Sequence, residues 1–119
     1  MSAMSRNKGA GGEREVSALI EDASGGVFKA QRGCQHAGRF AVGVASPDVL
    51  TDLPLHLEVK RTEKLAIWAA LTQVERDLDP ADDVTVPVVC FRRNRSRWYV
   101  CLPLEDWLKQ LGYEEGESG

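Results

Sequence analysis

Four residues in the first half of the chain have the types and order of a metal site that acts on phosphate: Glu13, Asp48, Glu58 and Lys60. Three carboxylates gathered at one point repel one another and resist ionisation, unless a divalent cation lies between them. Mg²⁺ takes oxygen ligands, keeps several waters and works on phosphate, and Mn²⁺ can replace it. We therefore expect a magnesium site here, with the backbone carbonyl of Val59 as a further ligand.

The residues around Glu58 have the pattern of a β-strand. Residues 55–60 alternate apolar with polar side chains, so the apolar ones would face the core and His56, Glu58 and Lys60 would line the other face. His56 could support the site there, or be an ordinary half-exposed strand histidine. Asp48 precedes a short apolar stretch, and the turn-forming residues 51–54 fold it back beside this strand. A hairpin would thus bring Asp48 to Glu58.

Glu13 must come from farther along the chain, on a helix predicted over residues 12–22. Val16, Leu19 and Ile20 recur there at helical spacing and give the helix one buried side. Gly11 and Gly12 would precede this helix and leave its first backbone amides open to an anion.

The remaining elements complete an α/β fold. A second helix runs to about residue 78, two strands follow over 86–91 and 98–102, and a final helix over 104–111 turns Leu104, Trp107, Leu108 and Leu111 inward. The order is helix, three strands, helix, two strands, helix (αβββαββα), which predicts a mixed central sheet flanked by helices. Residues 1–111 would form a single domain with a flexible basic arm over 1–11, followed by an acidic, disordered tail over 112–119.

Three short segments resemble the PD-(D/E)XK nuclease superfamily and, within it, the archaeal-type Holliday-junction resolvases: Asn7-Lys8-Gly9-Ala10-Gly11-Gly12-Glu13-Arg14-Glu15, Pro47-Asp48 and Glu58-Val59-Lys60. The resemblance covers roughly residues 6–102 and implies a restriction-endonuclease-like fold. It also implies a dimeric, magnesium-dependent endonuclease in which Glu13, Asp48 and Glu58 hold metal and Lys60 assists the attacking water. A polar residue of the second helix often approaches the site in this superfamily, and Gln73 is the candidate here. The long stretch 32–46 departs from the archaeal enzymes and indicates a phage or bacterial branch.

The expected reaction is hydrolysis of a DNA phosphodiester by a metal-bound water, without a covalent intermediate. A four-way junction in DNA recombination or repair would need paired symmetric nicks, which a two-fold homodimer supplies. Three alternatives remain: a related nuclease for flaps or other branched DNA, a non-catalytic DNA-binding module of the same fold, and a protein-interaction domain.

The net charge of −3 counts against nucleic-acid binding only when it is taken as one number. Residues 1–62 carry 8 Lys plus Arg and 7 Asp plus Glu, giving +1, whereas residues 63–119 carry 7 and 11, giving −4. Three acids of the first half are proposed metal ligands, so a bound cation would leave the working surface positive. The candidate DNA contacts are Arg6, Lys8, Arg32, Arg39, Arg61, Arg93 and Arg95.

Three cysteines cannot all pair within one chain, so Cys34, Cys90 and Cys101 are predicted to be free thiols. Cys90 and Cys101 lie about equally far from a turn at residues 95–96 and could face each other across a hairpin. The chain shows neither a long apolar span nor a leader segment. We expect a cytoplasmic protein without a membrane partner, acting in the host cytoplasm if it is encoded by a phage.

Overall fold

The structure is a computed structural model that describes residues 3–33 and 47–112. The described chain forms eight elements: α1 (Ala3–Ala23), β1 (Ala30–Arg32), β2 (Val49–Thr51), β3 (Leu55–Arg61), α2 (Ile67–Arg76), β4 (Val86–Arg92), β5 (Tyr99–Cys101) and α3 (Leu104–Gln110). Their order is the one that the sequence predicts. Among the described residues, no helix is both long and apolar enough to cross a membrane.

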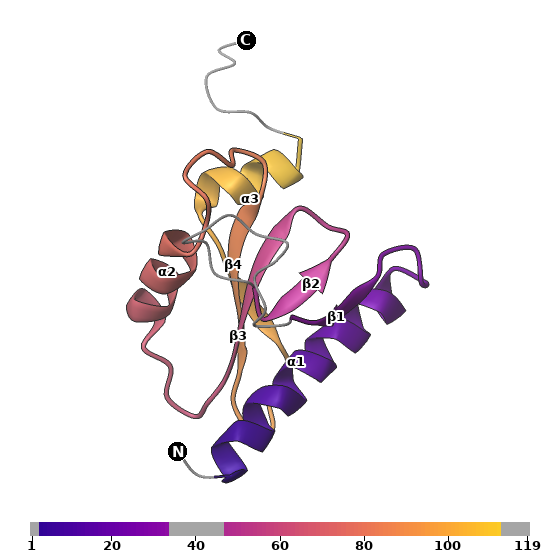
Figure 1. Cartoon of the computed structure of the whole chain (residues 1–119), viewed down its shortest axis with the longest axis vertical. Helices are drawn as coiled ribbons and strands as arrows, with labels where there is room; N and C mark the ends of the chain where they lie inside the picture. The colour runs from indigo at the N-terminus through magenta and orange to yellow at the C-terminus, as the bar shows by residue number, and fades with distance from the viewer. Residues whose placement is uncertain (1–2, 34–46, 113–119) are drawn as a thin grey trace.

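The five strands form one mixed sheet in the order β1-β2-β3-β4-β5. Neighbouring strands are antiparallel except for β3 and β4, which run parallel because α2 connects them as a crossover. Figure 1 shows α1 and α2 on opposite sides of this sheet. The α/β fold with a mixed central sheet and flanking helices is therefore confirmed.

The two faces of the sheet pack against different helices. Val16 of α1 joins a buried cluster with Leu57 and Val59 of β3, whereas Val74 of α2 packs with Val89 of β4 on the opposite face. Because successive strand residues point to opposite faces, the polar residues of β3 lie on the α2 side, as their alternation predicts. That face is covered by α2 and is not an open surface.

The first helix differs from its prediction at the N-terminal end. α1 begins at Ala3 and not at Gly12, so it includes residues 3–11, which were expected to form an arm. Gly11 and Gly12 therefore lie inside α1, and the expectation that their amides open a helix is wrong. Gly12 instead permits a close approach, because a Cβ there would lie 3.3 Å from both Val59 Cγ1 and Trp98 Cη2. This contact brings Glu13 close to the sheet.

The last helix, α3, does not bury its apolar residues. Leu104 is 66% exposed, Trp107 48%, Leu108 36% and Leu111 55%, so the prediction that they face inward is wrong. In Figure 1 α3 lies at the end of the chain that leads to the C-terminus. The sequence periodicity identified an apolar side of the helix but not whether anything covers it.

The register of β4 and β5 determines how two cysteines lie relative to each other. Cys90 pairs with Val100, and Val89 pairs with Cys101, so the two thiols differ by one position and point to opposite faces. The expectation that they face each other across the hairpin is wrong, whereas both are free thiols as predicted. Cys34 lies outside the described residues.

Candidate active site

The β2–β3 hairpin holds Asp48 against the centre of β3. The Asp48 backbone N–H donates to the Leu57 carbonyl at 2.9 Å, and Asp48 Oδ2 accepts a hydrogen bond from the Val59 N–H at 2.8 Å. On the other side the Gly33 N–H donates to the Asp48 carbonyl at 2.7 Å. A Cβ at Gly33 would overlap the Pro47 carbonyl oxygen, so only glycine fits there without a shift. The predicted approach of Asp48 to the Glu58 strand is thus produced by backbone geometry.

Glu58 is a buried acid with another carboxylate beside it. It is only 5% exposed. Burial, followed by the charge of Asp48 and a hydrogen bond to it, raises the pKa of Glu58 to about 8, although the Lys60 ammonium works in the opposite direction. The metal-free pair therefore tends to retain a proton near neutral pH, and a cation between the two groups would displace it.

Lys60 and Gln73 meet between β3 and α2. Lys60 Nζ donates to Gln73 Oε1 at 3.3 Å, so the helix does bring this glutamine to the predicted lysine. Gln73 and Asp77 are one helical turn apart and face the same strand. Since α2 returns antiparallel to β3, Gln73 lies near the end of the strand and Asp77 near its beginning.

A second group of polar side chains surrounds the beginning of β3. Ligand atoms of His56, Glu58 and Asp77 all lie within 4.8 Å of one another, and His56 Nε2 is 3.9 Å from Glu58 Oε1. His56 is 5% exposed, so it is not the half-exposed histidine that was one sequence interpretation. Burial lowers its pKa, in spite of the charges of Asp77 and Asp48. Sequence reasoning missed Asp77, and its only signal was the four-residue spacing from Gln73.

Glu13 is held apart from this group. Glu13 Oε2 accepts a hydrogen bond from Arg32 Nε at 3.0 Å, and Arg32 pairs with Val49, the residue after Asp48. Among the described residues, no set of three acids or histidines that includes Glu13 has all its ligand atoms within 4.8 Å. The structure thus brings together Asp48, Glu58, Lys60 and Gln73, and places Glu13 with Arg32 at the Asp48 end.

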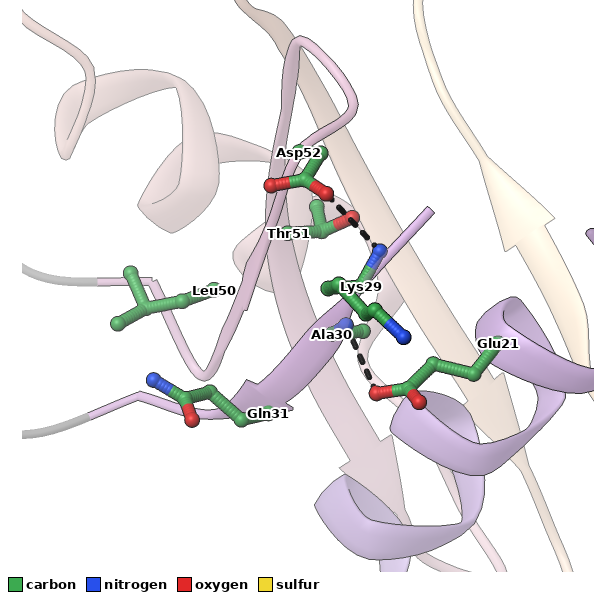
Figure 2. A pocket seen from close by; sticks show the side chains of 7 residues that line it. All are labelled: Glu21, Lys29, Ala30, Gln31, Leu50, Thr51 and Asp52. Carbon is green, nitrogen blue, oxygen red and sulfur yellow. Dashed lines mark hydrogen bonds between the residues drawn. The ribbon is translucent and has the colours of Figure 1, made fainter. Parts of the chain in front are cut away.

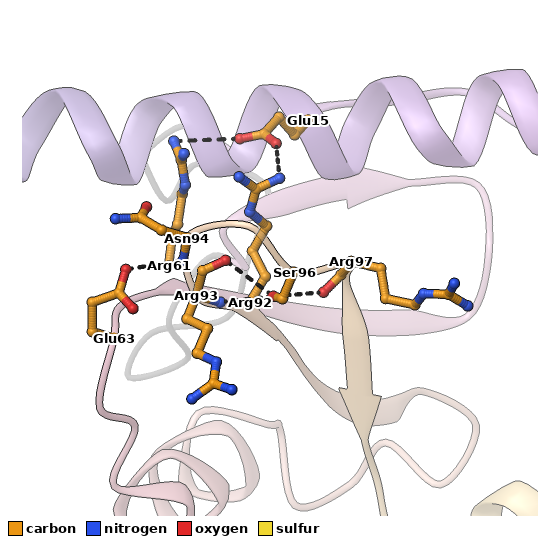
Figure 3. Close-up of polar contacts among 8 residues, drawn as sticks. All are labelled: Glu15, Arg61, Glu63, Arg92, Arg93, Asn94, Ser96 and Arg97. Atoms are coloured by element: carbon orange, nitrogen blue, oxygen red, sulfur yellow. Dashed lines mark hydrogen bonds and ion pairs between the residues drawn. The ribbon is translucent and has the colours of Figure 1, made fainter.

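Two of the arginines proposed for DNA contact acids of the protein itself, because Arg32 binds Glu13 and Arg61 lies beside Glu15. Arg61 and Arg92 both reach Glu15 of α1, at 3.5 Å and 2.8 Å, as Figure 3 shows. Arg93 and Arg95 are exposed at the tip between β4 and β5. Arg6 and Lys8 lie on α1, and Arg39 lies outside the described residues.

A polar cavity of about 390 Å³ lies at the opposite end of the β1–β2 ladder from Asp48 (Figure 2). Its two carboxylates bind backbone amides, because Glu21 Oε2 accepts from the Ala30 N–H at 3.1 Å and Asp52 Oδ2 from the Lys29 N–H at 3.0 Å. These acids tie α1 and the hairpin together, so we assign them a structural role.

A mixed sheet flanked by helices, with Asp48 and the Glu58-Val59-Lys60 strand side by side, defines the PD-(D/E)XK class of nucleases and its restriction-endonuclease-like fold. Residues 4–115 match the family described as "Phage putative PDDEXK endonuclease", and the chain belongs to this family. No curated protein and no solved structure matches the chain. The expected superfamily is thereby confirmed at the level of a nuclease that acts on DNA, a class that typically uses a divalent metal.

Proposed function

We propose that this nuclease hydrolyses DNA phosphodiesters at a site formed by Asp48, Glu58, Lys60 and Glu13, with Mg²⁺ or Mn²⁺ as cofactor. The single observation that supports this best is the hydrogen bond from the Val59 N–H to Asp48 Oδ2 at 2.8 Å. It ties the carboxylate of one motif to the middle residue of the other. The two motifs that the sequence separates by nine residues therefore form one polar centre.

The chemistry of the donor set fits a divalent metal. Glu58 is buried beside Asp48, and its pKa of about 8 reflects the cost of two neighbouring negative charges. Carboxylate oxygens are the ligands that Mg²⁺ prefers, and a bound cation would stabilise the ionised form of both acids. In the proposal Asp48, Glu58 and the Val59 carbonyl hold the ion. Glu13 would release Arg32 and become a further ligand of the ion.

A bound divalent ion would lower the pKa of a water molecule and offset charge on the phosphate. The Lys60 ammonium, oriented by Gln73, would hold the attacking water in line and add positive charge beside the phosphate as negative charge grows there. Arg32, once released by Glu13, would be available for a phosphate oxygen. His56 has a supporting position beside Glu58.

For the substrate we propose a four-way DNA junction, cut by paired symmetric nicks in a homodimer during recombination or repair. The exposed Arg93 and Arg95 support contact with phosphates outside the site. The exposed apolar side of α3, with Trp107 48% exposed, supports contact with a second subunit. Flaps and other branched DNA are the alternative substrate, and the site of action would be the cytoplasm, or the host cytoplasm for a phage enzyme.

Cleavage of a synthetic four-way junction tests this proposal, beside flap, linear duplex and single-stranded DNA of the same sequence. We expect Mg²⁺-dependent cutting that Asp48→Asn abolishes, with symmetric nick pairs confined to the junction. Equal cutting of flaps would indicate that the substrate is branched DNA in general and not the four-way junction alone. Unchanged cleavage activity in Asp48→Asn would refute the proposed site.

The dimer is tested separately by the molar mass in solution. We expect Trp107→Glu to yield monomers, whereas Trp68→Glu, at a residue 80% exposed on α2, should leave the dimer intact. A wild-type monomer at the concentration that gives paired nicks would contradict the two-fold arrangement.

A further inference from the structure

We propose that His56, Glu58 and Asp77 form a second cation site, which takes a divalent transition ion such as Mn²⁺, Co²⁺ or Zn²⁺ in preference to Mg²⁺. The three side chains come from the beginning of β3 and the C-terminal end of α2. Glu58 is shared with the proposed nuclease site, whereas His56 and Asp77 are metal ligands in this second site alone.

The distances suit ligands of one ion. His56 Nε2 is 3.9 Å from Glu58 Oε1, and the three ligand atoms lie within 4.8 Å of one another. Two ligands on opposite sides of an ion with bonds of about 2.1 Å are about 4.2 Å apart. The histidine and glutamate are already inside that limit, and Asp77, which is only partly buried, needs at most a small rotation.

The histidine is the observation that points to a ligand. The side chain of His56 is 6% exposed, and its Nε2 atom is buried with no hydrogen-bond partner among the described residues. Buried polar groups in folded proteins are nearly always paired, so such an atom calls for an explanation. Nε2 is directed toward the acidic group, where a bound ion would be its missing partner.

The acids support the same conclusion. Asp77 caps the C-terminal end of α2, where the helix dipole disfavours a negative charge. It also lies near the buried Glu58, so two carboxylates lie close together. The nearby Lys60 ammonium is turned toward Gln73. A cation at the group would offset the charges that the protein itself leaves close together.

The ligand types select the class of metal. Imidazole nitrogen is a good ligand for Zn²⁺ and Co²⁺ and can also bind Mn²⁺, whereas Mg²⁺ prefers oxygen and holds its waters tightly. The nuclease site around Asp48 offers only oxygen ligands. The two sites would therefore differ in the ion that each prefers. They would be adjacent, because Glu58 is a ligand in both.

Nitrogen coordination of Mn²⁺, measured by pulsed electron paramagnetic resonance, tests the inference. The chain has only two histidines, so His36→Gln leaves His56 as the one imidazole. In that background we expect a ¹⁴N coupling typical of a directly bound imidazole, which His56→Gln removes. Asp77→Asn should weaken binding of the nitrogen-coordinated Mn²⁺ by about tenfold or more. Asp79→Asn, a neighbouring acid outside the group, is the matched control and should bind Mn²⁺ as the wild type does.

The outcomes separate this site from the proposed nuclease. Asp48→Asn should keep the ¹⁴N coupling, because Asp48 is not one of the three ligands. Bound Mn²⁺ without nitrogen coupling, or nitrogen-coordinated Mn²⁺ that binds equally well in Asp77→Asn, would overturn the second site even if the protein cuts DNA. Conversely, a nitrogen-bound ion in a protein without nuclease activity would leave this inference standing and refute the proposed function.

Discussion

Replacing Glu58 with glutamine should stabilise the metal-free protein at alkaline pH, although it should abolish cleavage. Burial and Asp48 raise the pKa of this carboxyl from 4.5 to about 8. At about 1.4 kcal/mol for each pH unit, ionising the group in the folded state costs about 5 kcal/mol, which is an upper value because the structure can relax. Glutamine keeps the size of the side chain and removes the charge.

The sign follows from the two pKa values. Between pH 4.5 and about 8 the unfolded chain loses the Glu58 proton while the folded chain keeps it, so the free energy of unfolding falls as the pH rises. Below this window both states are protonated, and above it both are ionised. The advantage of Glu58→Gln should therefore be small at pH 5 and reach its full size near pH 9.

Urea unfolding followed by tryptophan fluorescence, with EDTA present, measures this difference at pH 5, 7 and 9. The control is Glu75→Gln, which removes an exposed charge from α2 and should change stability little at any pH. Saturating Mn²⁺ should stabilise the wild type more than Glu58→Gln, because a ligand that binds only the folded state raises its stability. A glutamine variant less stable than the wild type at pH 9 without metal would refute the electrostatic reasoning.

Three further predictions concern the same region. Lys60→Ala should reduce cleavage by about 100-fold or more while DNA binding is retained. The control Lys64→Ala, at an exposed residue, should leave both cleavage and binding unchanged. Parallel loss of binding by Lys60→Ala in a filter or gel assay would contradict the role of Lys60. Gly33→Ala should destabilise the protein by about 1–3 kcal/mol and lower the cleavage rate, because its Cβ would overlap the Pro47 carbonyl oxygen and displace Pro47 and Asp48. A melting curve unchanged from the wild type would argue against this. Burial, with the Asp48 charge, raises the pKa of Cys90 to about 12, so its thiol should resist alkylation at pH 8 until the protein unfolds. Mass-spectrometric mapping of the alkylated cysteines measures this, and rapid labelling of Cys90 in the native protein would disprove it.

The order of the elements and the two faces of β3 could be predicted from the sequence. Both depend on local patterns, because the alternation of residues 55–60 and the turn at 51–54 act through neighbours in the chain. The approach of Asp48 to the Glu58 strand followed from the same short-range reasoning and appears in the hydrogen bond to Val59. The resemblance to the PD-(D/E)XK superfamily also depends on short segments of the chain, and the family match over residues 4–115 confirms this superfamily.

The partner of each side chain could be seen only in the folded structure. Asp77 reaches His56 because α2 returns antiparallel to β3, and Glu13 binds Arg32 because α1 packs beside the end of β1. A shift of one residue in the β4–β5 register separates Cys90 from the position opposite Cys101. Such pairings depend on distances and burial between segments far apart in the chain, and periodicity within one segment carries no information about them.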